Sequence, residues 1–244
     1  MKEKRGRNIY APKQEKPYKL SRSKIEDYTK CPRCFYLDRR LGINKPSQIP
    51  FNLNSAVDGL LKKEFDTYRA KKEPHPLMLK HKVDAIPFAH PELDRWRANF
   101  TGVQYHHQPT NFLLQGAIDD LWITPQNKLI IVDYKATSKD AEINLDSQWQ
   151  LGYKRQMEIY QWLFRRNNFE VEDTGYFVYC NGLRTREAFN GRLEFDIYLL
   201  PYTASDTWVE ATIHELHQCL ESNEIPKAAD SCELCAYVHN VQQV

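Results

Sequence analysis

A predicted β-hairpin in the middle of the chain constrains the fold more than any other feature of the sequence. Two apolar runs, 112–124 and 129–135, flank the turn-forming sequence PQNK. Apolar runs on both sides of such a turn are typical of two antiparallel strands. The second run contains Ile130-Ile131-Val132, which is apolar on both faces and therefore suits a central strand that other elements cover on both sides.

The register of this hairpin brings charged side chains together. Pairing Thr124 with Lys128 across the turn places Asp119 directly opposite Asp133. Side chains alternate between the two faces of a strand, so Lys135 shares a face with Asp133. Opposed like charges destabilise a hairpin, and a cation between the carboxylates would remove that repulsion. Oxygen ligands of this kind are those that Mg²⁺ prefers.

These residues and three further segments resemble the RecB/Cas4-like branch of the PD-(D/E)XK nuclease superfamily. Asp119, in the sequence GAID, and Asp133 and Lys135, in DYK, match the active-site motif of the superfamily. The segment QMEIY, from Gln156 to Tyr160, is similar to the Gln-x-x-x-Tyr element of the branch. YTKCPRCFY and CELCAY, near the two ends of the chain, are similar to the cysteine elements that flank its nuclease core.

The resemblance implies an α/β fold with a restriction-endonuclease-like core, in which helices flank a mixed central β-sheet. The N- and C-terminal segments are expected to join at a four-cysteine site. A predicted helix at 147–166 and strands at 174–180 and 193–200 follow the hairpin and favour the same plan. Residues 1–20 are expected to form a basic N-terminal arm, and 21–244 a single nuclease domain. Further helices are expected from Lys24 and at 53–69, 91–100 and 205–222, with a loop at 70–90.

The resemblance assigns Asp119, Asp133 and Lys135 to the hydrolysis of phosphodiester bonds. Mg²⁺ or Mn²⁺ held by the two carboxylates would lower the pKa of a water molecule and neutralise phosphate charge. A nearby lysine orients the water or neutralises the transition state. The alternative is a structural ion pair on a half-exposed sheet. A register slip of one residue would exchange Asp119 for Asp120.

Three further residues are candidates for this site. Asp58 takes the position at which relatives often present a histidine to the metal, so it is a third candidate metal ligand. The alternative for Asp58 is an ion pair with Lys62. In the branch, the glutamine and tyrosine line the nucleic-acid channel, so Gln156 and Tyr160 are expected to bind substrate. The alternative for this pair is simple packing of an amphipathic helix on the sheet.

Four of the six cysteines form two C-x-x-C pairs, Cys31/Cys34 and Cys232/Cys235. In a reducing compartment such pairs indicate metal ligands. Four thiolates suffice for one tetrahedral Zn²⁺ or for one [4Fe–4S] cluster. The resemblance implies a cluster, usually held by one N-terminal and three C-terminal cysteines. This chain has two cysteines at each end, which departs from that pattern and favours zinc more than the family pattern does. Buried thiols without a metal are the remaining alternative.

Two histidine groups have no function in this interpretation. His214-Glu-Leu-His217 resembles a zinc-protease helix, but its histidines are spaced i,i+3 and not i,i+4 as in H-E-x-x-H. It is therefore predicted to be a partly exposed helix face. Nothing in the sequence gives the pair His106-His107 a function.

The distribution of charge and hydropathy bears on nucleic-acid binding, membrane insertion and cellular compartment. The net charge is only +2, but residues 2–24 carry nine Lys/Arg against two acids. Such a segment either contacts phosphates or is a solvated tail. The N-terminus has no apolar signal region, and no stretch approaches the ~20 apolar residues of a membrane span. A cytoplasmic protein without a membrane partner is expected.

The predicted function is a metal-dependent DNA nuclease of the exonuclease or DNA-end-processing type. DNA is the expected partner. The sequence contains no G-x-x-x-x-G-K-[ST] motor motif, so a helicase or other repair or defence proteins are candidate further partners. The alternatives are a non-catalytic nucleic-acid-binding module and an Fe–S-containing regulatory subunit of a DNA-repair or defence complex.

Overall fold

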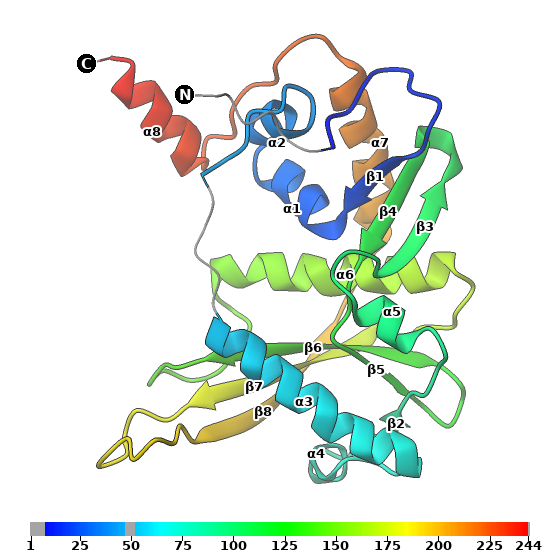
Figure 1. Ribbon diagram of the computed structural model, residues 1–244, viewed down its shortest axis with the longest axis vertical. Coiled ribbons are helices and arrows are strands. Elements are labelled where there is room, and N and C mark those ends of the chain that lie inside the picture. Colours follow the sequence, from blue (N-terminus) through cyan, green and yellow to red (C-terminus); the bar gives the residue numbers. More distant parts are fainter. Residues whose placement is uncertain (1–7, 47–51, 244) are drawn as a thin grey trace. The chain divides into compact units, whose positions relative to one another are not determined.

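The computed structural model describes residues 8–46 and 52–243, so the first seven residues of the predicted arm lie outside the described part. The chain divides into two compact units. Figure 1 labels their helices and strands. Of the described residues, unit 1 comprises 8–46, 104–115 and 206–243, and unit 2 comprises 52–103 and 116–205. The prediction of one domain at 21–244 stays a prediction. No described helix has the length and apolarity that a membrane span requires.

Unit 2 contains the predicted mixed central sheet. Its five strands lie in the order β2-β5-β6-β7-β8. Strand β6 is antiparallel to β5 and parallel to β7, and β7 is antiparallel to β8. The strands are β2 (Ile86–Pro87), β5 (Asp120–Ile123), β6 (Leu129–Thr137), β7 (Thr174–Gly182) and β8 (Phe195–Thr203).

Strands β5 and β6 form the predicted hairpin in the predicted register. The backbone N–H of Thr124 donates to the carbonyl of Lys128 over 3.0 Å, and Asp120 lies opposite Val132. Continuing this register by one residue places Asp119 opposite Asp133, just before β5 begins. The register is therefore not slipped.

The prediction of one continuous strand over 112–124 is wrong. Strand β4 (Phe112–Gly116) belongs to a different sheet from β5, and residues 117–119 separate the two. Backbone groups of this connection form hydrogen bonds with partners that are not neighbouring strands, so the strand cannot continue through it. The carbonyl of Ala117 accepts the hydroxyl of Tyr160, and the N–H of Ile118 donates to the carbonyl of Trp96.

Helices flank the central sheet, as predicted. Helix α3 (Asn52–Lys71) packs Phe65 against Trp122 and Tyr134 in a buried cluster on one face. Because side chains alternate along β6, Lys135 points to the opposite face, where it meets Tyr153 of α6 (Leu151–Arg166). A 3₁₀ turn at Gln148–Gln150 leads into α6.

Two short elements occupy the segment predicted as a loop at 70–90. Helix α4 (Pro76–Lys80) begins after His75, whose side chain accepts the N–H of Leu77, and strand β2 follows it. The prediction of loop missed both because their burial depends on distant partners. Helix α5 (Leu93–Arg97) is shorter than the predicted helix at 91–100, since Ala98 is already extended.

Unit 1 combines a small sheet with helices. Its strands are in the order β1-β4-β3, and β1 is parallel to β4. Strand β1 begins within the segment expected to be an arm, where Tyr10 and Tyr18 are buried. The sequence did not predict β1, β3, α2 or α8. The remaining elements are β1 (Tyr18–Ser21), α1 (Arg22–Lys30), α2 (Pro32–Arg39), β3 (Val103–His107), a 3₁₀ turn (Gln108–Thr110), α7 (Thr207–Glu221) and α8 (Glu233–Val241).

Candidate active site and cysteine site

Asp119 is held by the backbone of the hairpin. The N–H of Tyr134 donates to its Oδ2 over 2.9 Å, and Nζ of Lys62 on α3 lies 3.5 Å from its Oδ1. A carboxylate fixed by a backbone donor has little rotational freedom. Its second oxygen is thereby directed toward α3.

Asp133 and Lys135 form an ion pair beside Asp119. Asp133 is fully buried, and Lys135 is largely buried. Burial lowers the pKa of Lys135, but the charges of Asp133 and Asp119 outweigh it and raise the pKa above its ordinary value. The ammonium also lies 4.4 Å from the centre of the Tyr153 ring, a favourable cation–π distance. Lys135 therefore stays charged in a fixed position.

Asp58 on α3 lies beside Asp119. Burial raises the pKa of Asp58, repulsion from Asp119 raises it further, and Lys62 opposes both effects. Lys62 lies 2.8 Å from Oδ2 of Asp58, so the ion pair considered as the alternative is present. The other oxygen, Oδ1, is buried and has no hydrogen-bond partner within residues 8–46 and 52–243. Leaving such an oxygen without a partner costs free energy.

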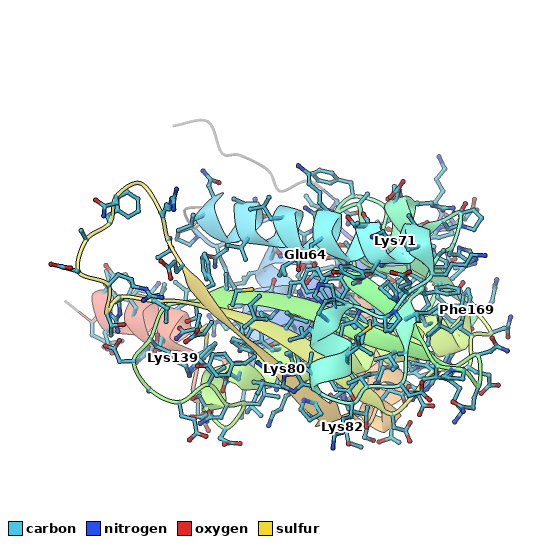
Figure 2. All side chains as sticks on the ribbon, turned by 90° about the horizontal axis from the view of Figure 1, so that it is seen from below. Glu64, Lys71, Lys80, Lys82, Lys139 and Phe169 are labelled. Atoms are coloured by element: carbon cyan, nitrogen blue, oxygen red, sulfur yellow. The ribbon has the colours of Figure 1, made fainter. Side chains whose placement is uncertain are left out.

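The donor set fits a hard divalent cation. Asp58 lies close enough to Asp119 for their charges to repel, and Asp119 and Asp133 both act on the charge of Lys135. Within the described part of the chain, Oδ1 of Asp58 is buried without a hydrogen-bond partner. We refer to Asp58, Asp119 and Asp133 as the carboxylate group. Mg²⁺ and Mn²⁺ favour carboxylate oxygens. Asp58, Lys135 and Tyr153 line a cavity of about 220 Å³. Glu64, another acid on α3 (Figure 2), pairs with His75 over 2.8 Å.

Arg97, which the sequence analysis did not identify, holds the backbone of Asp119 in place. Asp120 is fully buried, and it accepts hydrogen bonds from Nη2 of Arg97 over 2.7 Å and from the hydroxyl of Tyr134 over 2.8 Å. Arg69 also pairs with Asp120. Nε of Arg97 donates to the backbone carbonyl of Asp119 over 3.1 Å. Asp120 thus faces away from the carboxylate group, as predicted, yet fixes the guanidinium that holds Asp119.

Gln156 and Tyr160 lie one turn apart on α6 and contact each other. Nε2 of Gln156 donates to the hydroxyl of Tyr160 over 3.1 Å, and that hydroxyl donates to the carbonyl of Ala117. Tyr160 is buried, whereas Gln156 is partly exposed. Gly116 makes room for the ring, because a Cβ at this position would lie 2.6 Å from Tyr160 Cε1. Tyr160 therefore locks α6 to the connection that carries Asp119.

The four cysteines of the C-x-x-C pairs meet in unit 1. Cys34 Sγ lies 3.6 Å from Cys232 Sγ and 3.5 Å from Cys235 Sγ, and Cys31 Sγ lies 3.9 Å from Cys235 Sγ. All four sulfur atoms lie within 4.8 Å of one another. The N- and C-terminal segments of the chain are therefore joined here, as predicted.

Both pairs use the same position on a helix. Cys31 is the N-cap of α2, and Cys232 is the N-cap of α8. Cys34 and Cys235 follow three residues later, so each pair lies on one side of a helix N-terminus. Free N–H groups at such a terminus stabilise thiolates. Burial raises the pKa of Cys31, but backbone hydrogen bonds from Ala229 and Cys34 and the neighbouring thiols lower it to about 7.

The sulfur spacing fits a single metal ion. A tetrahedron with metal–sulfur bonds of about 2.3 Å has sulfur atoms about 3.8 Å apart, close to the three distances above. In a [4Fe–4S] cluster each thiolate binds a different iron atom, which spreads the sulfur atoms farther. The four thiols thus suit a metal, and three of their spacings match those around a single tetrahedral ion.

Comparisons with known proteins identify the family of the chain. No curated protein matches the chain. Among solved structures, one described as "Crystal structure of SSO0001" is 14% identical, covers 88% of this chain and 82% of that chain, and has a TM-score of 0.40. The model of the PD-(D/E)XK nuclease superfamily, however, matches residues 19–239, a range that contains every candidate residue above. The chain belongs to the PD-(D/E)XK nuclease superfamily.

Proposed function

We propose that this protein is a metal-dependent DNA nuclease that hydrolyses phosphodiester bonds at Asp119, Asp133 and Lys135. Membership of the superfamily supports nuclease activity and the use of a divalent metal. One observation carries the assignment of the site. Asp119 acts both on the charged Lys135, which is paired with Asp133, and on Asp58, whose Oδ1 is buried without a hydrogen-bond partner among the described residues.

The carboxylates and the lysine have different roles in the proposed reaction. Asp58, Asp119 and Asp133 would hold Mg²⁺ or Mn²⁺, which supplies a water of lowered pKa and neutralises phosphate charge. Lys135 keeps a positive charge in place, where it orients the attacking water or stabilises charge that develops on the phosphate. The buried carboxylate of Asp133 and the ring of Tyr153 fix that charge.

Gln156 and Tyr160 have different parts in this proposal. Gln156 is partly exposed, and its amide is suited to donate to a phosphate of the substrate. Tyr160 is buried, so it acts mainly by positioning, through its hydrogen bonds to Gln156 and to the connection before Asp119.

The finer assignment is to the RecB/Cas4-like branch, with an exonuclease or DNA-end-processing activity. It rests on the Gln-x-x-x-Tyr element together with cysteine pairs at both ends of the superfamily match. A helicase or other repair or defence proteins are the partners that this assignment suggests. At the cysteine site we favour Zn²⁺ over a [4Fe–4S] cluster, because the sulfur atoms are already spaced for one ion.

Cleavage of labelled linear and circular DNA tests the proposal. We expect cleavage with Mg²⁺ or Mn²⁺, none with EDTA, and a preference for linear DNA. Asp133→Asn should abolish cleavage. Glu64→Gln, which changes an acid on α3 outside the carboxylate group, should retain it. DNA binding without cleavage under every metal condition would contradict the proposal and favour a non-catalytic binding module.

A further inference from the structure

The structure brings together histidines that the sequence left without a function. His107 ends β3, and Glu210 and His214 lie one turn apart on α7. Nε2 of His107 lies 2.7 Å from Oε1 of Glu210, and Nε2 of His214 lies 3.7 Å from the same oxygen. One ligand atom from each of the three residues lies within 4.8 Å of the other two. This spacing is close enough for one ion to contact all three.

The buried side of this cluster is oriented by a threonine. Oγ1 of Thr110 lies 2.8 Å from Nδ1 of His107, and both side chains are buried. The hydrogen bond to Nδ1 fixes the ring so that its other nitrogen faces Glu210. A partner of this kind on the far ring nitrogen is usual for histidines that bind metals.

The other side of the cluster is open. The side chains of Glu210 and His214 are 38% and 47% exposed, so an ion can enter and water can complete its coordination. Their i,i+4 spacing puts both on one side of α7. His217, which the sequence pattern had paired with His214, turns instead toward Glu221 at 3.9 Å. Two imidazoles, one carboxylate and a water form the ligand set of an open zinc site.

We propose that His107, Glu210 and His214 form a binding site for a divalent transition-metal ion, best suited to Zn²⁺. This site shares no residue with the carboxylate group or with the four cysteines. The ion would bind Nε2 of the neutral His107 ring in place of the proton that faces Glu210, and the ring proton would then lie on Nδ1, which donates to Oγ1 of Thr110. It would tie α7 to the end of β3 within unit 1.

Zinc titration of the full-length protein tests this site. Metal already held by the cysteines is first counted by elemental analysis, and excess Mg²⁺ is added to occupy the carboxylate group. Isothermal titration calorimetry should then show one further Zn²⁺ per chain. His214→Ala and Glu210→Gln should each weaken its binding by at least about tenfold, as expected for lost ligands. His81→Ala, which changes an exposed histidine of unit 2, should bind as the wild type does.

Cobalt provides a readout that distinguishes this site from the thiolates. Co²⁺ at His107, Glu210 and His214 should give visible bands without thiolate-to-metal charge transfer, and His214→Ala should lose them. His214 is half exposed, so the metal-free variant should melt as the wild type does. The proposal is overturned if the wild type takes up no ion beyond those at the cysteines. It is also overturned if His214→Ala and Glu210→Gln bind the further ion as tightly as the wild type.

Discussion

Lys135 is the side chain whose replacement tests both the proposed chemistry and the packing around it. Its ammonium is the cation paired with the fully buried carboxylate of Asp133. Removing one partner of a buried ion pair costs about 3–5 kcal/mol. We therefore expect Lys135→Ala to abolish cleavage and to lose about 3 kcal/mol of unfolding free energy in EDTA. Cleavage rates and urea denaturation measure the two effects.

A double variant separates these two effects. Lys135→Ala combined with Asp133→Asn no longer buries an unpaired charge, so it should recover most of the stability and remain inactive. Lys128→Ala removes a lysine from the exposed turn of the same hairpin and should keep both activity and stability. Wild-type turnover in Lys135→Ala would show that this lysine takes no part in the chemistry.

Asp58 should have opposite effects with and without metal. Because its pKa is raised in the folded protein, its ionisation destabilises the fold above the ordinary aspartate range. Protonation removes this penalty as the pH falls through the raised pKa. At neutral pH in EDTA, Asp58→Asn should therefore melt at a higher temperature than the wild type, and the difference should vanish in acid.

Added Mg²⁺ should reverse the order of the two melting temperatures. The wild type then gains more stability than Asp58→Asn, because the ion binds a complete set of carboxylates. Cleavage by Asp58→Asn should fall less than cleavage by Asp133→Asn, whose carboxylate lies on the central strand. An equal rise in melting temperature with Mg²⁺ in both proteins would place the ion away from Asp58.

Among the helices and strands, the contact between α6 and the connection before β5 decides where Asp119 lies. A Cβ at Gly116 would lie 2.6 Å from the ring of Tyr160, so Gly116→Ala must displace one of these segments. Overpacking of this kind costs about 1–3 kcal/mol. We expect Gly116→Ala to lower kcat as well as stability, measured by steady-state cleavage and denaturation.

Gly59 on α3 provides the matched control. A Cβ there meets nothing within 4 Å, and alanine is favoured over glycine in a helix by about 1 kcal/mol. Gly59→Ala should therefore stabilise the protein and leave kcat unchanged. If Gly116→Ala lowered stability but left kcat unchanged, the position of Asp119 would not depend on this contact.

For the chain as a whole, the four cysteines hold its two ends together. Helix α8 buries none of its side chains, so the Cys232 and Cys235 thiolates are expected to provide much of its attachment. Metal binding at such a site contributes directly to folding free energy. Cys232→Ser should therefore lose the bound metal, and limited proteolysis should cleave its C-terminal segment faster than that of the wild type.

Elemental analysis of the same preparations identifies the metal. We expect zinc in the wild type and little in Cys232→Ser. Cys219→Ser, whose thiol lies outside the cluster, should match the wild type in metal content and in proteolysis. Iron in place of zinc would show that the site holds a cluster. Equal proteolysis of all three proteins would show that α8 does not depend on the cysteines.

The hairpin and its register could be predicted from local sequence patterns. The turn at 125–128 and the alternation along β6 lie within a few residues of each other, so the position of Asp119 opposite Asp133 follows from strand geometry. The break between β4 and β5 did not follow. It depends on Trp96 and Tyr160, which lie in distant parts of the sequence and bond to Ile118 and Ala117 respectively.

Contacts between distant segments explain the other omissions. Arg97 holds Asp119 across 22 residues, and no spacing rule connects the two. The one available signal was Asp120, since an acid in an apolar strand needs a buried cation. His107 and Glu210 lie 103 residues apart, so the cluster that they form with His214 is visible only in the folded chain. The C-x-x-C pairs were recognisable because each is a local motif.

The lack of buried side chains on α8 makes an intact C-terminus an indicator of metal loading. If sulfur–metal bonds anchor this helix, a molecule that loses its ion to a chelator or an oxidant releases the tail while its central sheet stays folded. Clipped chains should then accumulate in ageing preparations in proportion to the fraction that is metal-free. Intact-mass spectrometry of a stored sample would thus report, from the fraction of clipped chains, how much of the protein had lost metal from its cysteine site.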